Sequence, residues 1–375
     1  MTRYDVVVAG GGPAGAAAAL ALARAGRSVL LADPGRGPAP VGEALPAAAR
    51  VLLGDLGAGG VLTGGHLPCP ANRSAWGGPV PACTDSLFDP HGHGWHLDRP
   101  LFDRRLREYA RAQGAQLCTA AVRPNALGKD GSWTVELRGA GAVARCRWLI
   151  DATGRRAAIA TASGARRRTR DRLVALHLTL GPADTADATT TVEAAPDGWW
   201  YTAPLPTGHR LLAWYTDADL PAADPADFTA RLAATDHISP LTSRHPWPLG
   251  ATPRRAPAHT AHLDPVTGPG WTAAGDAAAA YDPLSSQGIL TALYTGLAAG
   301  RAVHAHLAGD RTALPAYRAD LAAIRAAYLR NHRAHYAAEQ RWPERPFWQR
   351  RHERSSTWPF PPAGVAADHP PAGSP

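Results

Sequence analysis

Glycines near the amino terminus have the spacing of a loop that binds phosphate. Residues Gly10-Gly11-Gly12-Pro13-Ala14-Gly15 fit the pattern G-x-G-x-x-G. In such a loop Gly10 permits a tight turn, Gly12 lets the backbone approach a pyrophosphate, and Gly15 allows a helix to pack closely on a strand. The free N–H groups of the following helix attract the phosphates. We therefore predict a dinucleotide site that includes Gly10, Gly12, Pro13, Ala14 and Gly15.

The segments around these glycines are those that a nucleotide-binding βαβ unit requires. Residues 5–9 form an apolar run typical of a buried parallel strand, residues 14–25 an alanine-rich helix, and residues 28–32 a second apolar strand. Asp33 ends the second strand 23 positions after Gly10, where a carboxylate can accept hydrogen bonds from ribose hydroxyls. The pattern occurs in a proper βαβ frame only once, so we expect no second domain for NAD(P)H.

Two later segments identify the kind of dinucleotide. Asp151-Ala152-Thr153-Gly154 closes an expected strand, and Gly275-Asp276 opens another turn. With the amino-terminal glycines they resemble the three cofactor motifs of FAD-dependent proteins of the aromatic-hydroxylase group. The resemblance implies that Asp151, Gly154 and Gly275 belong to the FAD site. It also implies that Asp276 contacts the ribityl chain.

The residues from Asp282 through Pro283 to Gly288 lead into a long helix expected over 288–307. The resemblance places Pro283, Gly288 and the amino end of this helix near the pyrimidine ring of the flavin. A positive dipole end at that place would stabilise negative charge on the reduced flavin.

Two charged residues are further candidates for FAD contact. Arg99 precedes an expected helix over 100–113, and members of the group carry a similar arginine on the cofactor side. The alternative is a helix-start arginine in a surface salt bridge. Gly42-Glu43-Ala44-Leu45-Pro46 resembles the G-E-x-x-P loop of the halogenase-like branch. Glu43 either binds or orients the flavin, or is a simple acidic residue at a helix start.

The resemblance covers about residues 3–350. Within it, the chain is most similar to the flavoprotein maturases of tryptophylquinone enzymes, which hydroxylate a peptidyl tryptophan, and to the related tryptophan halogenases. The segments that carry this similarity are rich in histidine and tryptophan, and they are residues 65–68, 72–77, 89–99, 198–201, 341–343 and 346–348.

Halogenation itself is not expected. Flavin halogenases share a W-x-W-x-I-P motif and an essential lysine. The corresponding stretch begins at Trp199, but Tyr201 replaces the second tryptophan and Ala203 the isoleucine. The only lysine, Lys129, falls in a Gly-Lys-Asp-Gly turn far from the place of the catalytic residue. The resemblance then implies direct transfer of oxygen from a flavin C4a-hydroperoxide to an electron-rich ring, in a dry pocket.

Aromatic and histidine side chains are candidates for the substrate side. Aromatic walls stack on indole or phenol rings, so we predict a pocket formed by Trp76, Trp199, Trp200, Tyr201 and Trp214, although such rings also simply fill sheets. His66, His93 and His96 are weak candidates for proton transfer, with solvated loop histidines as the alternative. No carboxylate or cysteine completes a metal set with the histidines, so no metal is expected.

Composition and pattern set the fold class. The chain is 45% hydrophobic and 19% charged, enough apolar material for a core. We predict an α/β protein, α+β overall, with a Rossmann-like FAD-binding domain and an antiparallel-sheet substrate domain. Residues 64–96 are expected to be loop-like. The expected division is 1–65, 96–168 and 262–335 for a discontinuous FAD-binding domain, 66–95 and 169–261 for the substrate-binding domain, and 336–375 for a C-terminal segment with a disordered tail.

The net charge and the cysteine spacing bear on the cellular location of the protein and on its partners. The net charge is +8, but single-sign runs are short, and we expect no nucleic-acid partner. The four cysteines contain no C-x-x-C pair, and no signal peptide or membrane span is evident, so we expect a cytoplasmic protein.

The expected function is an FAD-dependent monooxygenase that hydroxylates an aromatic, indole-type substrate. The substrate is either a small molecule or a tryptophan within a peptide or protein. Reducing equivalents come either from NAD(P)H or from a separate flavin reductase. Two alternatives stay open: a flavin-dependent dehydrogenase or reductase of the geranylgeranyl-reductase type, and a non-catalytic flavoprotein maturation factor.

Overall fold

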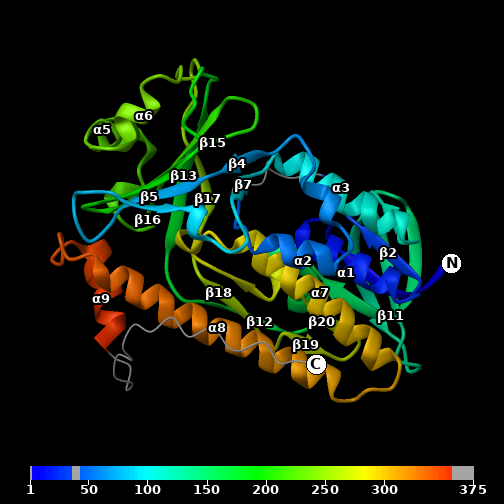
Figure 1. The fold of residues 1–375 in the computed structure, drawn as a ribbon. Helices are drawn as coiled ribbons and strands as arrows, with labels where there is room; N and C mark the ends of the chain where they lie inside the picture. Colours follow the sequence, from blue (N-terminus) through cyan, green and yellow to red (C-terminus); the bar gives the residue numbers. More distant parts are fainter. Residues whose placement is uncertain (1, 36–42, 357–375) are drawn as a thin grey trace.

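Two large β-sheets organise the protein (Figure 1). The structure is a computed structural model that describes residues 2–35 and 43–356. Within those residues one sheet has eight strands and combines parallel and antiparallel pairs, and the other has seven strands and is antiparallel except at one pair. The predicted combination of a Rossmann-like sheet with an antiparallel sheet is confirmed.

The eight-stranded sheet contains the amino-terminal βαβ unit. Its central path runs β19-β20-β11-β1-β2-β8, and the pairs β20–β11, β11–β1, β1–β2 and β2–β8 are parallel. The strands are β1 (Thr2–Ala9), β2 (Val29–Ala32), β8 (Gln116–Cys118), β9 (Ala121–Leu127), β10 (Trp133–Arg138), β11 (Ala142–Asp151), β19 (Thr267–Gly268) and β20 (Trp271–Ala273). Val6, Val7 and Val8 are fully buried, as expected for a strand in the middle of a covered parallel sheet.

The seven-stranded sheet follows the order β17-β13-β16-β15-β14-β5-β6. The strands are β5 (Ala71–Ala75), β6 (Ala82–Asp85), β13 (Leu173–Leu180), β14 (Thr190–Ala195), β15 (Gly198–Pro204), β16 (Arg210–Asp217) and β17 (Arg254–Pro257). Both faces of β15 and β16 are buried, and alternate residues belong to two different hydrophobic clusters. This alternation follows from the two-residue period of a strand.

Smaller sheets and helices connect these two layers. The small strands are β3 (Ala44–Leu45), β4 (Leu67–Cys69), β7 (Gly94–His96), β12 (Arg166–Thr169), β18 (Ala261–Asp264) and β21 (Ala279–Ala280). The helices are α1 (Pro13–Arg24), α2 (Ala49–Asp55), α3 (Arg99–Ala112), α4 (Ala158–Ala162), α5 (Phe228–Ala233), α6 (Ile238–Thr242), α7 (Gly288–Leu307), α8 (Ala313–Ala338) and α9 (Pro346–Ser356). Figure 1 shows α8 running from beside α7 to α9, and so from one large sheet to the other.

Several sequence expectations need correction. The segment 64–96, expected to be loop-like, contains β4, β5, β6 and β7. Two of these strands pair outside the segment, β5 with β14 and β7 with β3, which no local pattern records. The C-terminal segment continues as α9, and Phe347 and Trp348 are fully buried. The predicted disordered tail over 361–375 lies outside the described residues. The helix expected over 288–307 has those bounds.

The strands of the two large sheets fall in different parts of the chain. All eight strands of the first lie within 1–65, 96–168 and 262–335, and all seven of the second lie within 66–95 and 169–261. The domain boundaries themselves stay a prediction. Among the described helices, none combines the length and the apolar character that crossing a membrane requires.

Helices α1 and α7 lie so close that glycine is required between them. A Cβ atom at Gly296 would come within 2.1 Å of the Ala14 carbonyl oxygen, and one at Gly300 within 2.9 Å of the Ala18 carbonyl oxygen. These contacts involve backbone atoms, which cannot rotate away as a flexible side chain can. The two glycines therefore fix the distance between α1 and α7.

Replacing Gly296 with alanine should destabilise the fold. We expect Gly296→Ala to lower the free energy of unfolding by about 1–3 kcal/mol, because the added methyl group forces the two helices apart. Gly54 in α2 is a matched control, since a Cβ there would meet nothing within 4 Å. Gly54→Ala should be neutral or stabilise by about 0.5–1 kcal/mol, through a less flexible unfolded chain. Thermal unfolding measures both, and equal melting temperatures would contradict the close contact.

Candidate active site

A cavity of about 310 Å³ lies between the two large sheets. Its walls come from the glycine loop and the start of α1, from the turns after β11 and β20, from the segment before α7, and from strands β13, β15, β16 and β17. The cavity therefore joins the predicted dinucleotide site to one face of the antiparallel sheet.

The three motif glycines have different roles. Gly10 has a φ of +103°, and a Cβ there would lie 2.2 Å from the Ala152 carbonyl oxygen. A Cβ at Gly15 would lie 1.8 Å from the Gly10 carbonyl oxygen. A Cβ at Gly12 would meet nothing within 4 Å, and Gly12 borders the cavity with Pro13 and Ala14. Gly10 and Gly15 are therefore needed for the fold, whereas the open side of Gly12 is where a phosphate can approach the backbone.

Asp33 holds the glycine loop in place. Its carboxylate accepts hydrogen bonds from the backbone N–H groups of Gly11 at 2.5 Å and Gly35 at 2.7 Å. Arg107 donates to the Gly11 carbonyl oxygen at 2.9 Å from the other side. The ribose contact of Asp33 stays a prediction, and residues 36–42, which follow it, lie outside the described residues.

Asp151 supports the site from behind. Its fully buried carboxylate accepts from the N–H and hydroxyl groups of Thr153 and from the N–H groups of Ile159 and Ala160. Asp151 is not among the residues that line the cavity, and its place at the cofactor stays a prediction. It fixes the turn that brings Gly154, with a φ of +68°, to the cavity wall.

The turn after β20 forms the next wall. Gly275 has a φ of +60°, and a Cβ there would lie 2.6 Å from the Ala14 Cβ, so this turn touches α1. Asp276 lines the cavity, and the side chain of Arg155 lies 3.7 Å from its carboxylate. Sequence reasoning missed Arg155, which also lines the cavity and which directly follows the Gly154 motif.

The segment before α7 offers the positive end of a helix. Pro283, Ser286 and Gly288 line the cavity, and Ser286 has a φ of +50°. No side chain caps the amino terminus of α7. Unsatisfied N–H groups at such a terminus attract negative charge, which a reduced flavin carries. This wall therefore fits the predicted cofactor.

Arg99 and Glu43 lie at the same end of the molecule. Arg99 lines the cavity and forms an ion pair with Asp103 at 3.3 Å. Burial raises the pKa of Asp103, and the charge of Arg99 opposes the rise. Glu43 is buried, and its backbone carbonyl oxygen accepts from the Leu97 N–H at 2.8 Å. Direct contact of either side chain with the flavin stays a prediction.

Tyr201 and Tyr215 form the aromatic wall of the cavity. Burial, and then the charge of Glu43, raise the pKa of both tyrosines, so both stay neutral. Trp199 lies one layer behind: its ring stacks on Tyr215 at 3.9 Å, and its N–H donates to the Tyr336 hydroxyl at 3.0 Å. Trp76 meets this cluster edge-on, 6.5 Å from Trp199. Of the five predicted pocket residues, Tyr201 is the one that lines the cavity.

Trp200 and Trp214 are a correction to the predicted pocket. Both are buried in a cluster with Phe228 of α5, whereas Trp199 and Tyr201 belong to the cluster on the opposite face of the sheet. Neighbouring residues of a strand point to opposite faces, so Trp200 cannot share a wall with Tyr201. The two tryptophans fill the space between the sheet and helices α5 and α6.

The three predicted histidines are not cavity residues either. His66 accepts from the Asp98 N–H at 3.1 Å, and burial lowers its pKa. His96 is fully buried, pairs with the Ala188 carbonyl oxygen at 2.9 Å, and also has a pKa lowered by burial. His93 lines a separate, smaller cavity. All three support β7 and its neighbours, and the proton-transfer role suggested for them is not favoured.

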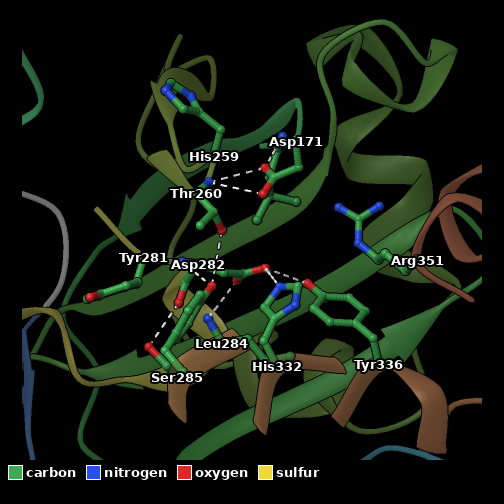
Figure 2. Close-up of polar contacts among 12 residues, drawn as sticks. Asp171, His259, Thr260, Tyr281, Asp282, Leu284, Ser285, His332, Tyr336 and Arg351 are labelled. Carbon is green, nitrogen blue, oxygen red and sulfur yellow. Dashed lines mark hydrogen bonds and ion pairs between the residues drawn. The ribbon is translucent and has the colours of Figure 1, made fainter. Parts of the chain in front are cut away.

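A buried polar cluster that the sequence did not predict borders the cavity instead. Asp282 lines the cavity and is 2% exposed. Figure 2 shows its carboxylate facing His332 and Tyr336, which come from α8. These partners lie 50 and 54 positions later in the chain, so no local pattern could have found the cluster. Within the described residues, no group of histidine, cysteine and acidic side chains has the arrangement of a metal site.

Comparison with known proteins identifies the family. Residues 66–359 match the tryptophan halogenase family. The chain belongs to that family. Among curated proteins it is 28% identical to the Marinomonas mediterranea protein named "Putative FAD-dependent oxidoreductase LodB", over 95% of this chain and 99% of that protein. It is 32% identical to a menaquinone reductase of Mycobacterium tuberculosis, over 78% of this chain and 74% of that protein.

A solved structure agrees with this assignment. The peptidyl tryptophan dihydroxylase QhpG, described as essential for tryptophylquinone cofactor biogenesis, is 29% identical and superposes with a TM-score of 0.78. The match covers 98% of this chain and 82% of QhpG. This member of the tryptophan halogenase family is therefore a flavin-dependent oxidoreductase with FAD as cofactor. The open side of Gly12 and the uncapped amino terminus of α7 both fit that group.

Two glycine variants should separate cofactor binding from folding. We expect Gly12→Val to abolish FAD binding while leaving the free energy of unfolding of the apoprotein within about 0.5 kcal/mol, because the new side chain occupies only the phosphate position. Gly15→Val should prevent folding, because its Cβ would overlap the Gly10 carbonyl oxygen. Flavin absorbance after gel filtration and thermal unfolding measure the two properties. Wild-type FAD content in Gly12→Val would show that the phosphate position is misassigned.

Proposed function

We propose that this protein is an FAD-dependent monooxygenase that hydroxylates an indole-type aromatic substrate, either free or within a peptide. The observation that carries the proposal is a cavity that joins the dinucleotide motif to an aromatic wall of Tyr201 and Tyr215 and is lined by no lysine. Such a wall excludes water and stacks on an aromatic ring, worth roughly 0.5–1.5 kcal/mol per ring pair beyond burial.

The position of the single lysine argues against halogenation. Lys129 is exposed in the turn between β9 and β10, at the edge of the eight-stranded sheet. It lies outside the cavity, and the strand where the halogenase motif is expected carries Tyr201 and Ala203 instead of tryptophan and isoleucine. Membership of the tryptophan halogenase family is therefore compatible with oxygen transfer instead of halogen transfer.

The protein supplies binding, orientation and exclusion of water. When reduced, FAD supplies the electrons that activate molecular oxygen. Gly12 and the start of α1 would hold the pyrophosphate, and Asp276 and the amino end of α7 would face the remainder of the cofactor. Tyr201 and Tyr215 stay neutral and keep the opposite wall free of charge. Apolar walls that exclude water limit the hydrolysis of reactive intermediates.

The similar proteins support two reactions. QhpG is named for hydroxylation of peptidyl tryptophan, which supports the proposed reaction and substrate class. The similarity to a menaquinone reductase favours a second candidate, in which the flavin reduces the substrate without inserting oxygen. The chemistry of the product distinguishes the two, because a monooxygenase incorporates one atom of molecular oxygen and a reductase incorporates none.

Isotope labelling tests the reaction. With chemically reduced FAD and ¹⁸O₂, we expect N-acetyl-L-tryptophanamide or a tryptophan-containing peptide to gain a hydroxyl group whose oxygen is labelled. Bromide and chloride should leave the product unchanged, because the cavity has no lysine to direct a hypohalous acid. Mass spectrometry reads label and halogen together. A halogenated product, or an altered probe without label, would refute the monooxygenase.

The electron source follows from the single nucleotide fold. In the described residues one Rossmann-like sheet carries the one glycine motif, so no second dinucleotide fold is there to hold NAD(P)H. Hydride transfer needs the reacting atoms roughly 3–3.5 Å apart, which weak binding seldom achieves. We therefore propose a separate flavin reductase as the partner that supplies reduced FAD.

Stopped-flow reduction without oxygen tests this partner. Without oxygen, we expect NADH or NADPH alone to bleach the absorbance of oxidised flavin slowly. In a separate reaction with oxygen, we expect hydroxylated product to form several times faster with NAD(P)H and a flavin reductase than with NAD(P)H alone. A reductase that receives no nicotinamide is the control. Fast, saturable reduction by NAD(P)H alone that substrate accelerates would place the enzyme among single-component hydroxylases.

A further inference from the structure

The carboxylate of Asp282 lies between two cavities. On one side it lines the active-site cavity, beside Tyr215 and the segment that leads to α7. On the other side its partners His332 and Tyr336 line a second, smaller cavity together with Arg170 and Arg351. His332 keeps 16% of its side chain exposed, whereas Asp282 keeps 2%. A titratable pair thus connects the active-site cavity with a separate pocket.

Three hydrogen bonds hold the Asp282 carboxylate. Its Oδ1 accepts from the Leu284 N–H at 2.9 Å, and its Oδ2 accepts from His332 Nε2 at 3.1 Å and from the Tyr336 hydroxyl at 2.8 Å (Figure 2). An ionised carboxylate has about four acceptor positions, so these donors leave about one for a group in the cavity. The backbone N–H of Asp282 donates to the Tyr328 hydroxyl at 2.9 Å, and this bond fixes the main chain of Asp282.

The balance of forces keeps Asp282 ionised at rest. Burial alone would raise the pKa of Asp282, but the hydrogen bond and charge of His332, followed by the bonds from Leu284 and Tyr336, lower it overall. The hydrogen bond from His332 is the larger part of this contribution and persists with a neutral ring, whereas the smaller, electrostatic part requires a charged ring. When His332 is neutral, Asp282 is therefore the stronger base.

Two other histidines lie near the pair: His352, whose Nε2 atom is 3.2 Å from the Tyr336 carbonyl oxygen, and His259, whose pKa is lowered by burial and by the charge of Arg155. Burial raises the pKa of Tyr215, Tyr328 and Tyr336, so these hydroxyls stay protonated. Arg351 on α9 forms an ion pair with Asp217 at 2.9 Å and stays charged, as does Arg155 in the cavity wall. Arg170, Asp171 and Arg333 border the second cavity. Histidine is the side chain that ordinarily titrates between roughly pH 5 and 8.

We propose that Asp282 is the catalytic base that removes the ring proton during hydroxylation, and that His332 sets its strength. The inference rests on the proposed function. As oxygen bonds to the ring carbon, the C–H bond at that carbon breaks, its electron pair restores the aromatic ring, and the proton moves to Asp282. His332, when charged, releases one proton to water in the second cavity, so the charge of the pair is conserved.

The same pair can reset within one turnover. The second atom of molecular oxygen leaves as water and needs a proton in the same cavity. Asp282 returns the proton that it took, and His332 regains one from the second cavity. The reaction then balances: one aromatic C–H, one O₂, two electrons and two protons give one hydroxyl group and one water. In this proposal Asp282, which lines the cavity, receives the ring proton directly, whereas His332 acts through Asp282 as a positioning residue.

The expected pH dependence has a definite sign. A neutral His332 leaves Asp282 the stronger base, so removal of the ring proton should accelerate as pH rises through the histidine range. At low pH this step becomes slow, and a deuterated indole ring should react more slowly than a normal one. At high pH the step is fast, and the deuterium effect should disappear.

The experiment measures single-turnover hydroxylation of N-acetyl-L-tryptophanamide, and of a tryptophan-containing peptide, with normal or deuterated indole rings. We expect His332→Gln to keep FAD and to lose both the pH dependence and the deuterium effect, because glutamine can donate to Asp282 but cannot titrate. Asp282→Asn should slow the reaction by about 10²–10⁴-fold and show a deuterium effect at every pH. Thr260→Val is the matched control: it removes only the 3.1 Å contact with the Tyr328 hydroxyl and should keep the wild-type pH profile.

The outcomes separate the two proposals. Suppose that the wild-type product carries label from ¹⁸O₂ and that His332→Gln keeps the wild-type pH profile and deuterium effect. This result would refute the proposed roles of Asp282 and His332 and would still support the monooxygenase. Absence of label from every probe would refute both. If Asp282→Asn does not retain FAD, the His332→Gln profile decides alone, since a purely structural role of His332 would not remove a pH dependence.

Discussion

Backbone contact around α1 is the constraint on which the rest of the structure depends. Cβ atoms at Gly15, Gly275 and Gly296 would collide with the Gly10 carbonyl oxygen, the Ala14 Cβ and the Ala14 carbonyl oxygen, respectively. With no side chain between them, the glycine loop, the turn after β20 and α7 meet at the same end of α1. The glycine loop is far in the chain from the other two segments, and all three thereby become neighbours around one cavity. Gly12, by contrast, is open and borders the cavity, at the predicted position of the cofactor phosphates.

Neighbouring aromatic residues of the antiparallel sheet have different structural roles, because they point to opposite faces. Along β15, Trp199 and Tyr201 face the cavity side, whereas Trp200 faces α5 and α6. Register pairs Trp199 with Tyr215 and Trp200 with Trp214, so each face receives a matched aromatic pair. One pair supports the active-site wall and the other is core. Because the side chains are chemically similar, residue type alone does not show which pair supports the active-site wall and which pair is core.

Helix α8 connects the cofactor side with the substrate side. It begins beside α7 and ends beside α9, where Phe347 and Trp348 are fully buried against the antiparallel sheet. Tyr328, His332 and Tyr336 are spaced four residues apart and so share one face of the helix. That face meets the loop containing Asp282. Burying a carboxylate costs free energy unless the carboxylate has hydrogen-bonding or charged partners. Helix α8 provides such partners for Asp282 at the wall of the cavity.

The amino-acid sequence by itself determined the features whose chemistry is local. The glycine spacing around Gly12, the turn at Gly275 and Asp276, and the helix over 288–307 could be predicted because each is defined by residues next to one another in the chain. The family, the cofactor and the fold class followed from these. Tertiary structure alone decided that Trp200 and Trp214 face away from the cavity, that His66 and His96 are structural, and that Asp282 has partners on α8. These depend on strand register and on contacts between residues far apart in the chain, which no local pattern records.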